Sequence, residues 1–217
     1  NNGIILNHLG QYKKAIECYD EVIKIDKKDK HALLNKCDIL GKKLGQLKKA
    51  KNCYREVLKI RSENSNDWRM DGICFSRLGQ YRKAIKYYDK ALKMNPKNMA
   101  AKFAKAYTLS EKLSKHDAAT KCYNEILEID PNDPMTLNNI GWTYHQLKKY
   151  TQAIPFYDEA IKQDKKNVHA WDSKAVTLYK LKKYSQALIC CKMAVKLGTK
   201  DKEVLSCFEK IKTKLKS

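Results

Sequence analysis

Long apolar stretches are missing from this chain of 217 residues. Its apolar runs reach about five residues, as in 187–191, whereas a membrane-spanning helix needs roughly 20. The architecture of a signal peptide is missing too. Proline and glycine are scarce, at 4 and 8 residues, and the 43% of hydrophobic residues can bury a core, which excludes wholesale disorder. We therefore expect a cytoplasmic protein that does not insert into a membrane.

Patterns that carry catalysis are missing as well. The chain has no Gly-x-Ser-x-Gly, no His-Glu-x-x-His and no calcium-binding loop. The five histidines, His145 among them, are interpreted as polar surface residues. We expect no enzyme, no cofactor and no bound metal, although catalytic sequence could lie before Asn1, where the chain starts without a methionine.

Cysteine is abundant, but its spacing does not indicate a disulfide framework. No Cys-x-x-Cys occurs, and no cysteine has a histidine at the spacing of a zinc site. Four cysteines follow an alanine by three residues inside amphipathic helical patterns, namely Cys18, Cys53, Cys122 and Cys190. Since cysteine behaves as a small buried hydrophobe, we predict reduced core thiols in a cytosolic protein.

Acidic residues are few relative to basic ones. The 45 Lys and Arg outnumber 24 Asp and Glu, for a net charge of +21. Such an excess favours nucleic acids, anionic membrane surfaces or acidic proteins as partners. Composition alone does not say whether the charge gathers on a binding surface or is spread as solvating cover.

What the chain does have is an internal repeat. Alanines recur at intervals of 35, 34, 35, 34 and 34 residues. They are Ala15, Ala50, Ala84, Ala119, Ala153 and Ala187. An aromatic residue follows four positions later in five of the six cases, from Tyr19 to Tyr157, and Cys191 takes that position in the sixth.

Each repeat is predicted to hold two helices. Apolar residues of the second helix recur with a 3.6-residue period, as in the stretch 84–92. A Leu-Gly pair marks the turn before it at Gly10, Gly45 and Gly79, where a left-handed residue suits glycine. Pro155 lies early in its helix, so we expect at most a mild distortion there.

These residues resemble the tetratricopeptide repeat (TPR) family over essentially the whole chain. Small residues occupy the position of the family's helix-contact glycine in five repeats, and Cys37 replaces them once. They are Gly3, Gly72, Ala106, Gly141 and Ala175. The resemblance implies an all-α fold, a right-handed superhelical α-solenoid of helix-turn-helix units.

We interpret the chain as one array of repeats. Repeat one is incomplete and covers residues 1–29, and repeats two to six cover 30–64, 65–98, 99–133, 134–167 and 168–201. The second repeat carries an extra residue near 41–44 and the fourth one near 112–114. Residues 202–217 are predicted to form a capping helix with Val204, Phe208, Ile211 and Leu215 on one face. The N-terminal end has no such cap, so we expect preceding sequence, packing on another molecule, or self-association there.

The resemblance also implies where function lies, because first helices of this family line a concave groove that holds peptides or protein segments. Transferred by repeat position, the candidate groove residues are Asn35, Arg69, Phe103, Tyr107, Asn138, Asn139, Trp142 and Tyr179. Asn35 and Asn139 share one repeat position, and an amide can both donate to and accept from a peptide backbone. The alternative is that they are tolerated surface residues.

Phe103, Tyr107, Met135 and Trp142 are expected to form an aromatic patch of the kind that marks interaction sites. The alternative is burial between adjacent first helices. The family's carboxylate clamp, which grips a chaperone's C-terminus, is not expected, because its five positions read Leu34, Asp38, Met70, Ala100 and Ala104.

Most of the positive charge falls outside the groove positions. Basic pairs recur at matched positions in turns and second helices, as at Lys13–Lys14, Lys48–Lys49 and Arg82–Lys83. We interpret them as solvated ridges on the outer surface. The sequence thus favours a non-catalytic scaffold that binds a peptide or protein segment. The alternatives are non-specific association of the basic surface with RNA or DNA and self-assembly through the first repeat.

Overall fold

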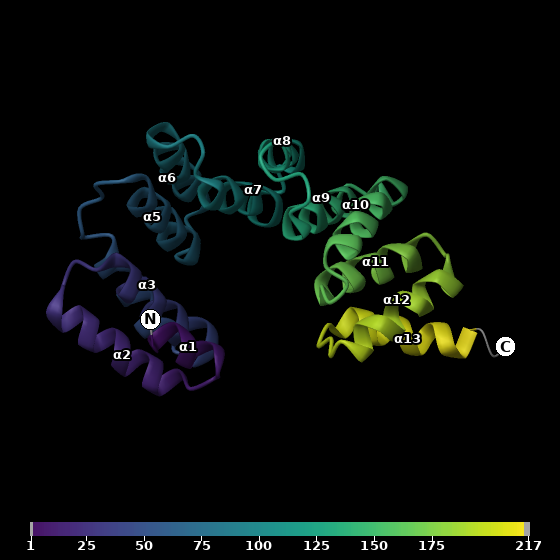
Figure 1. The fold of residues 1–217 in the computed structure, drawn as a ribbon, viewed down its shortest axis with the longest axis horizontal. Helices are drawn as coiled ribbons and strands as arrows, with labels where there is room; N and C mark the ends of the chain where they lie inside the picture. Colours follow the sequence, from purple (N-terminus) through teal and green to yellow (C-terminus); the bar gives the residue numbers. More distant parts are fainter. Residues whose placement is uncertain (1, 215–217) are drawn as a thin grey trace. The chain divides into compact units, whose positions relative to one another are not determined.

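The computed structural model describes residues 2–214 and is all-α, as predicted (Figure 1). Its helices are α1 (Asn2–His8), α2 (Tyr12–Ile25), α3 (Lys30–Asp38), α4 (Leu47–Val57), α5 (Ser65–Arg77), α6 (Tyr81–Met94), α7 (Met99–Leu113), α8 (His116–Leu127), α9 (Pro134–Gln146), α10 (Tyr150–Gln163), α11 (Val168–Lys180), α12 (Tyr184–Lys196) and α13 (Lys202–Lys214), with a π-helix, η1 (Ile39–Lys43), after α3.

The chain divides into two compact parts, which we describe separately. The N-terminal part is Asn1–Thr108 and the C-terminal part is Leu109–Ser217, so the boundary falls within α7. In the N-terminal part each helix from α1 to α6 packs on the next one along the chain. In the C-terminal part the same holds from α8 to α13, and the first helices α9 and α11 also touch.

The repeat alanines are buried positions of the second helices. All six are 0–2% exposed, from Ala15 to Ala187. Small side chains there let the helix backbones approach each other closely. The predicted glycine turns have positive φ angles of 74°, 65° and 78° at Gly10, Gly45 and Gly79, the left-handed region that glycine enters without steric cost.

The extra residue of repeat two is absorbed by a change of helix type. The stretch predicted to hold it overlaps η1, whose wider turn accommodates one more residue without breaking the helix. In repeat four, α7 runs on to Leu113 and Ser114 takes a positive φ of 52°. Pro155 lies inside α10, which continues unbroken over 14 residues.

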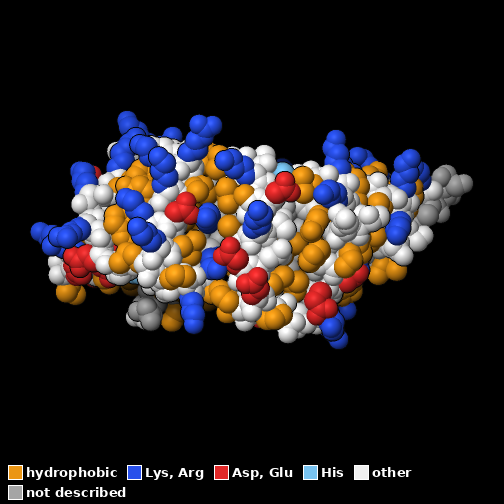
Figure 2. Space-filling model, turned by 90° about the horizontal axis from the view of Figure 1, so that it is seen from above, with side chains coloured by type: hydrophobic (Ala, Val, Ile, Leu, Met, Phe, Trp, Pro, Cys, Tyr) orange, Lys and Arg blue, Asp and Glu red, His pale blue; other side chains and the backbone are white. Residues whose placement is uncertain are grey.

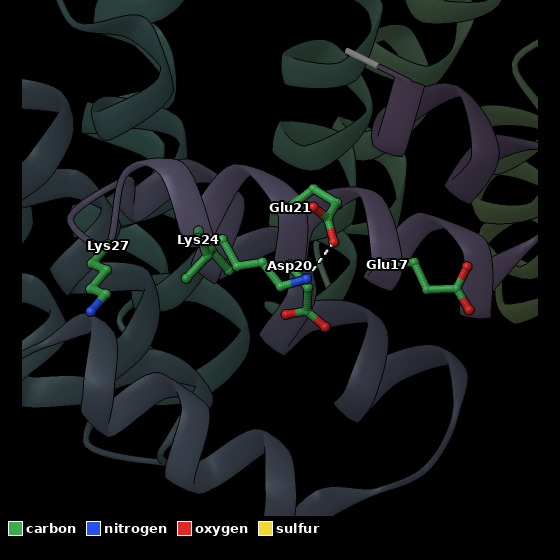
Figure 3. A pocket seen from close by; sticks show the side chains of 6 residues that line it. Glu17, Asp20, Glu21, Lys24 and Lys27 are labelled. Atoms are coloured by element: carbon green, nitrogen blue, oxygen red, sulfur yellow. Dashed lines mark hydrogen bonds and ion pairs between the residues drawn. The ribbon is translucent and has the colours of Figure 1, made fainter.

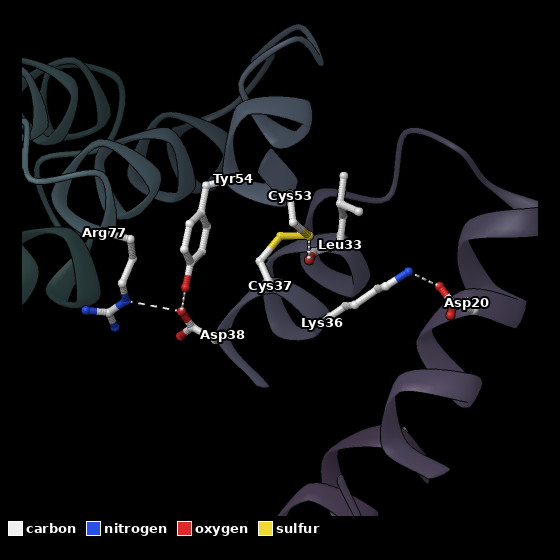
Figure 4. Close-up of a disulfide and its surroundings, with 8 residues drawn as sticks. All are labelled: Asp20, Leu33, Lys36, Cys37, Asp38, Cys53, Tyr54 and Arg77. Atoms are coloured by element: carbon white, nitrogen blue, oxygen red, sulfur yellow. Dashed lines mark hydrogen bonds and ion pairs between the residues drawn. A yellow bond between two sulfur atoms is a disulfide. The ribbon is translucent and has the colours of Figure 1, made fainter. Parts of the chain in front are cut away.

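The prediction that all eight cysteines are reduced core thiols is wrong for one pair. Cys37 of α3 and Cys53 of α4 form a disulfide (Figure 4). The residue at the helix-contact position of repeat two is itself a cysteine, so its sulfur points at the partner helix, where the repeat places Cys53. The other six cysteines are free, and five of them are buried.

The predicted capping helix is α13. Val204 and Ile211 are fully buried against repeat six and Phe208 packs at the edge of that core, as expected. Leu215 lies outside the described residues. No helix among the described residues is long and apolar enough to span a membrane.

Candidate functional site

The predicted binding residues are distributed over the first helices of both parts. We call the N-terminal face the side chains Asn35, Asp38, Lys42, Arg69, Ile73, Arg77, Phe103 and Tyr107, on α3, η1, α5 and α7. We call the C-terminal face the side chains Asn138, Asn139, Trp142, His145, Asp172, Val176, Tyr179 and Lys180, on α9 and α11.

Asp38 is the electrostatic centre of the N-terminal face. Its Oδ1 accepts hydrogen bonds from the Tyr54 hydroxyl at 2.6 Å and from Arg77 Nε at 3.1 Å (Figure 4). Lys42 Nζ donates to its Oδ2. Burial by itself would raise the pKa of Asp38, but Arg77, Lys42 and Tyr54 outweigh burial and lower it. Asp38 is therefore an ionised carboxylate whose partners lie within the chain.

Arg69 differs from its neighbour Arg77. Its side chain is half-buried on α5, and Nε is buried without a hydrogen-bond partner among the described residues. Burial lowers the pKa of the Arg69 guanidinium. Burial also acts to lower the pKa of Arg77, yet Asp38 outweighs it and raises that pKa. The Asp38 carboxylate therefore compensates the charge of Arg77 but not that of Arg69.

The remaining members of the N-terminal face differ in exposure. Asn35 is half-buried near Tyr19, and its amide opposes the rise that burial causes in the pKa of Tyr19. Phe103 is half-buried, whereas Tyr107 is 42% exposed. Tyr107 is thus a large apolar ring open to solvent one repeat away from Arg69.

The C-terminal face contains a cluster that the sequence did not predict. The Trp142 ring stacks on His145 with 4.7 Å between ring centroids, and His145 Nδ1 lies 2.7 Å from Thr177 Oγ1. His145 is 9% exposed, so its interpretation as a surface residue is wrong. Burial, followed by the charge of Lys180, lowers its pKa to about 4.

Asn138, Asn139 and Tyr179 of the C-terminal face are half-buried, whereas Asp172 and Val176 are buried and Lys180 is exposed. Asn139 Nδ2 donates to the Met135 carbonyl of its own helix at 2.7 Å. Tyr179 packs edge-on against Tyr184 of α12, 5.6 Å between centroids. The expected aromatic patch has members in both parts of the chain, so it stays a prediction.

One repeat position stands out on both faces. It is occupied by Leu34, Arg69, Phe103, Asn138 and Asp172, at intervals of 34 or 35 residues. Three of these residues are polar, and each has a buried atom without a hydrogen-bond partner among the described residues: Arg69 Nε, Asn138 Oδ1 and Asp172 Oδ1. Buried polar atoms are normally paired, so this recurrence needs a physical reason.

Ion pairs between successive repeats were missed at the sequence level. Lys105 Nζ lies 2.7 Å from Asp89 Oδ1, and the equivalent pairs are Lys36–Asp20 and Lys174–Asp158. Their sequence signal recurs in repeats two, four and six: a lysine precedes the helix-contact position, and an aspartate follows the aromatic residue of the preceding repeat. Repeat five has Ile140 at the lysine position, and repeat three has Asp71, which bonds to a buried Lys30 at 2.8 Å.

Neither of two surface pockets coincides with the predicted groove residues. One, of about 570 Å³, lies on α2 between Glu17 and Lys27 (Figure 3). Its charges are compensated locally, since Lys24 pairs with Glu21 at 2.6 Å. The other, of about 860 Å³, lies beside the turns around Lys28 and Arg61. No group of His, Cys, Asp and Glu among residues 2–214 could hold a metal ion.

The basic pairs Lys13–Lys14, Lys48–Lys49 and Arg82–Lys83 lie in the first turns of second helices and are exposed. Figure 2 shows Lys and Arg side chains spread over the visible face, with fewer Asp and Glu among them. Apolar side chains are also exposed on α1, at Ile4 and Ile5, and directly after it at Leu9.

Comparison with known proteins agrees with this architecture. A tetratricopeptide repeat model matches residues 3–29 and 31–64, and a model of the N-terminal TPR region of Psidin matches residues 74–173. No curated protein sequence matches the chain.

Solved structures with the same fold have low sequence identity. A TPR protein from Parabacteroides merdae ATCC 43184 aligns at a TM-score of 0.77 and 19% identity, over 96% of this chain and 81% of that one. YrrB, described as a TPR protein with an unusual peptide-binding site, aligns at a TM-score of 0.54 and 23% identity, over 79% of this chain and 88% of its own. A chain of the APC/C hetero-tetramer Cut9–Hcn1 aligns at a TM-score of 0.74 and 14% identity, over 96% of this chain and 41% of that one. The paired helices, the repeat positions and these matches agree: the chain belongs to the tetratricopeptide repeat family.

Proposed function

We propose that this chain is a non-catalytic scaffold that binds an extended segment of another protein on its first-helix faces. The TPR repeat is generally a protein–protein interaction module, and YrrB, with the same fold, is described as having a peptide-binding site. The proposal transfers that kind of activity to the N-terminal and C-terminal faces of this chain.

The observation that carries the proposal is the shared repeat position of Arg69, Asn138 and Asp172, each with an unpaired buried atom. Leaving a polar atom unpaired costs about 1–3 kcal/mol. A bound peptide backbone offers both N–H donors and carbonyl acceptors. For Asn138, a turn about the terminal side-chain bond brings the amide oxygen toward such a donor, so binding would recover part of this cost.

The pairing of Asn139 with Met135 is consistent with this role. The amide donates to its own helix at 2.7 Å, which fixes the side chain while leaving its oxygen available as an acceptor. A side chain fixed before binding loses less entropy when the ligand arrives. We therefore assign Asn139 to the backbone of the bound segment and Trp142 to one of its side chains.

The test is selection from a random 12-residue peptide library, followed by affinity measurement with variants. Asn139→Ala/Trp142→Ala is expected to weaken binding of a selected peptide at least about 10-fold, since large aromatic contacts dominate interfaces. The matched control is Gln186→Ala/Ile189→Ala, which removes an exposed amide and an exposed apolar side chain from α12.

Two further results complete this test. Because Trp142 packs on His145, Asn139→Ala is also measured alone and each variant's thermal unfolding is recorded. Equal loss of binding in the first-helix variant and the α12 control would contradict the proposal, as would a library from which wild-type protein selects nothing.

Nucleic-acid association is the second candidate, and the recurring basic pairs favour it. Lys48 and Lys49 are exposed in the first turn of α4, where a helix dipole disfavours positive charge. Binding of a 20-nucleotide RNA that falls steeply with salt, and that Lys48→Glu/Lys49→Glu removes, would support this candidate. Absence of RNA binding at low salt would exclude it.

A further inference from the structure

Arg69 is the unpaired cation of the N-terminal face. Its guanidinium makes no hydrogen bond or ion pair with any of residues 2–214, and its Nε is buried. Arginine at an open surface can leave its donors to water. A half-buried guanidinium has lost part of that water and gains from a protein acceptor instead.

The other cations on this face already have a partner. Arg77 Nε lies 3.1 Å from Asp38 Oδ1, and Lys42 occupies the other oxygen of the same carboxylate. The Tyr54 hydroxyl adds a third hydrogen bond to Asp38 at 2.6 Å. Asp38 is thus fully engaged within the chain, and it is the only carboxylate among the side chains that define the N-terminal face.

The charge balance of the face therefore favours an acidic occupant. Its defining side chains include three cations, Lys42, Arg69 and Arg77, and one carboxylate, Asp38. On the C-terminal face the position equivalent to Arg69 is filled by Asn138 and Asp172, so the positive character is specific to the N-terminal face. Tyr107, 42% exposed, adds apolar surface on the next first helix.

A carboxylate fits the donors that Arg69 leaves unused. The planar guanidinium carries five N–H donors in a fixed fork, which pairs with the two oxygens of a carboxylate. Partial burial strengthens such a pair relative to one in open solvent. An amide or hydroxyl group would meet only one of the donors at a time and would bring no charge.

We infer that the N-terminal face binds an acidic protein segment, and that Arg69 holds a carboxylate of that segment, from an Asp or Glu side chain or from a C-terminus. This inference rests on the proposed function and names the chemistry of the partner. Arg69 acts by pairing with the carboxylate, and Tyr107 covers an apolar side chain beside it.

The experiment uses fluorescein-labelled peptides selected by the wild-type chain from the random 12-residue library. Each is synthesised with its acidic residues changed to the matching amides, and separately with an amidated C-terminus. Affinities are measured for wild type, Arg69→Gln and Arg82→Gln. The last is the matched control, because Arg82 is exposed on α6 and its replacement removes the same charge.

The expected result is that Arg69→Gln raises Kd by about 10- to 100-fold, the usual range for a lost charged hydrogen bond. Arg82→Gln is expected to change Kd less than about 3-fold, because an exposed charge acts only through screened attraction. Removing one particular carboxylate from the peptide is expected to match the loss caused by Arg69→Gln, and the two losses should not add. Whether that carboxylate is a side chain or the C-terminus identifies its source.

Several results would overturn the inference. Selected peptides that bind without any carboxylate, or equal losses with Arg69→Gln and Arg82→Gln, would refute it while leaving the proposed function intact. Selection of no peptide at all would refute both. Binding of an oligouridylate that Arg69→Gln weakens, with no peptide competing for it, would assign the site to phosphate. The peptide substitutions keep the test valid even if Arg69→Gln unfolds the chain.

Discussion

The ring of Tyr88 lies against the backbone of Gly72 so closely that a Cβ on Gly72 would meet ring carbon Cε1 at 2.4 Å. The same contact recurs between Gly141 and Tyr157, at 2.6 Å. Repeats two and four keep the aromatic residue but carry Cys37 and Ala106 at the glycine position. In repeats three and five, therefore, the ring fills the space that a side chain on the glycine would need.

Gly72→Ala is expected to lower the free energy of unfolding by about 1–3 kcal/mol, because the added methyl overpacks the contact with Tyr88. In the background Tyr88→Leu, which removes the ring, the same change is expected to cost nothing or to stabilise the helix by up to about 1 kcal/mol. Urea unfolding of the four proteins measures this coupling. Equal effects of Gly72→Ala in both backgrounds would contradict the packing argument.

The buried pair of Lys30 and Asp71 ties repeat two to repeat three. Their side chains are 3% and 5% exposed, and Lys30 Nζ also donates to Ser62 Oγ at 2.7 Å. Lys30→Met leaves a buried carboxylate without its cation, so we expect a loss of about 3–5 kcal/mol.

The double variant Lys30→Met/Asp71→Leu is expected to regain most of that loss, since no buried charge is left. The matched control is Lys24→Met, which breaks an exposed pair with Glu21 and should leave stability unchanged. Chemical unfolding measures all three, and a double variant no more stable than Lys30→Met would refute the electrostatic explanation.

His145 predicts a specific loss of stability in acid. Its pKa is lowered to about 4 in the folded chain, below the value of about 6.5 that an unfolded chain gives it. The unfolded state therefore binds the proton first, and the stabilisation present above about pH 6.5 is lost as the pH falls toward 4.

The expected size of this loss is about 2–3 kcal/mol for His145 alone. Unfolding by urea at pH 7 and pH 4.5 is compared between wild type and His145→Gln, which keeps a donor for Thr177 without a titrating group. Wild type should lose more stability than the variant by that amount. Parallel pH dependence of the two proteins would contradict the burial of His145.

The disulfide determines how many cysteine thiols react when the protein is unfolded without reductant. Protein purified without reductant and unfolded in guanidinium should expose six thiols to a thiol reagent, and eight after reduction, because Cys37 and Cys53 are joined. The bridge spans a sequence separation of 16 residues, so its reduction should lower the free energy of unfolding by about 3 kcal/mol. Eight reactive thiols before reduction would show that the pair is not bonded.

The pairing of helices could be predicted from the sequence because the same pattern of residues recurs along the chain. The alanine interval, the aromatic residue four positions later and the Leu-Gly turns are enough to place twelve helices and the capping helix along the chain. The same periodicity located the extra residue of repeat two, but not the π-helix that absorbs it, since that depends on how η1 packs against α4.

The environment of individual side chains was harder to predict. His145 lies late on a first helix, a position that suggests exposure, but Thr177 of the next repeat and the ring of Trp142 enclose it. The Cys37–Cys53 pair needed the orientation of two neighbouring helices as well as their spacing. Arg69 was predicted as a groove residue from its repeat position. Its lack of a partner could be recognised only in the structure, where Tyr54, Arg77 and Lys42 bind Asp38.

The central claim is that ligand binding takes place on the first helices. It is tested most directly by spectra of protein labelled at the isoleucine methyls and tryptophan indoles, recorded with and without a selected peptide. We predict that Ile73 or Trp142 shifts, on the N-terminal or the C-terminal face, while Ile189, exposed on α12, and Trp68, packed on Tyr87, stay in place. Shifts confined to Ile189 and its neighbours, with Ile73 and Trp142 unmoved, would contradict the account.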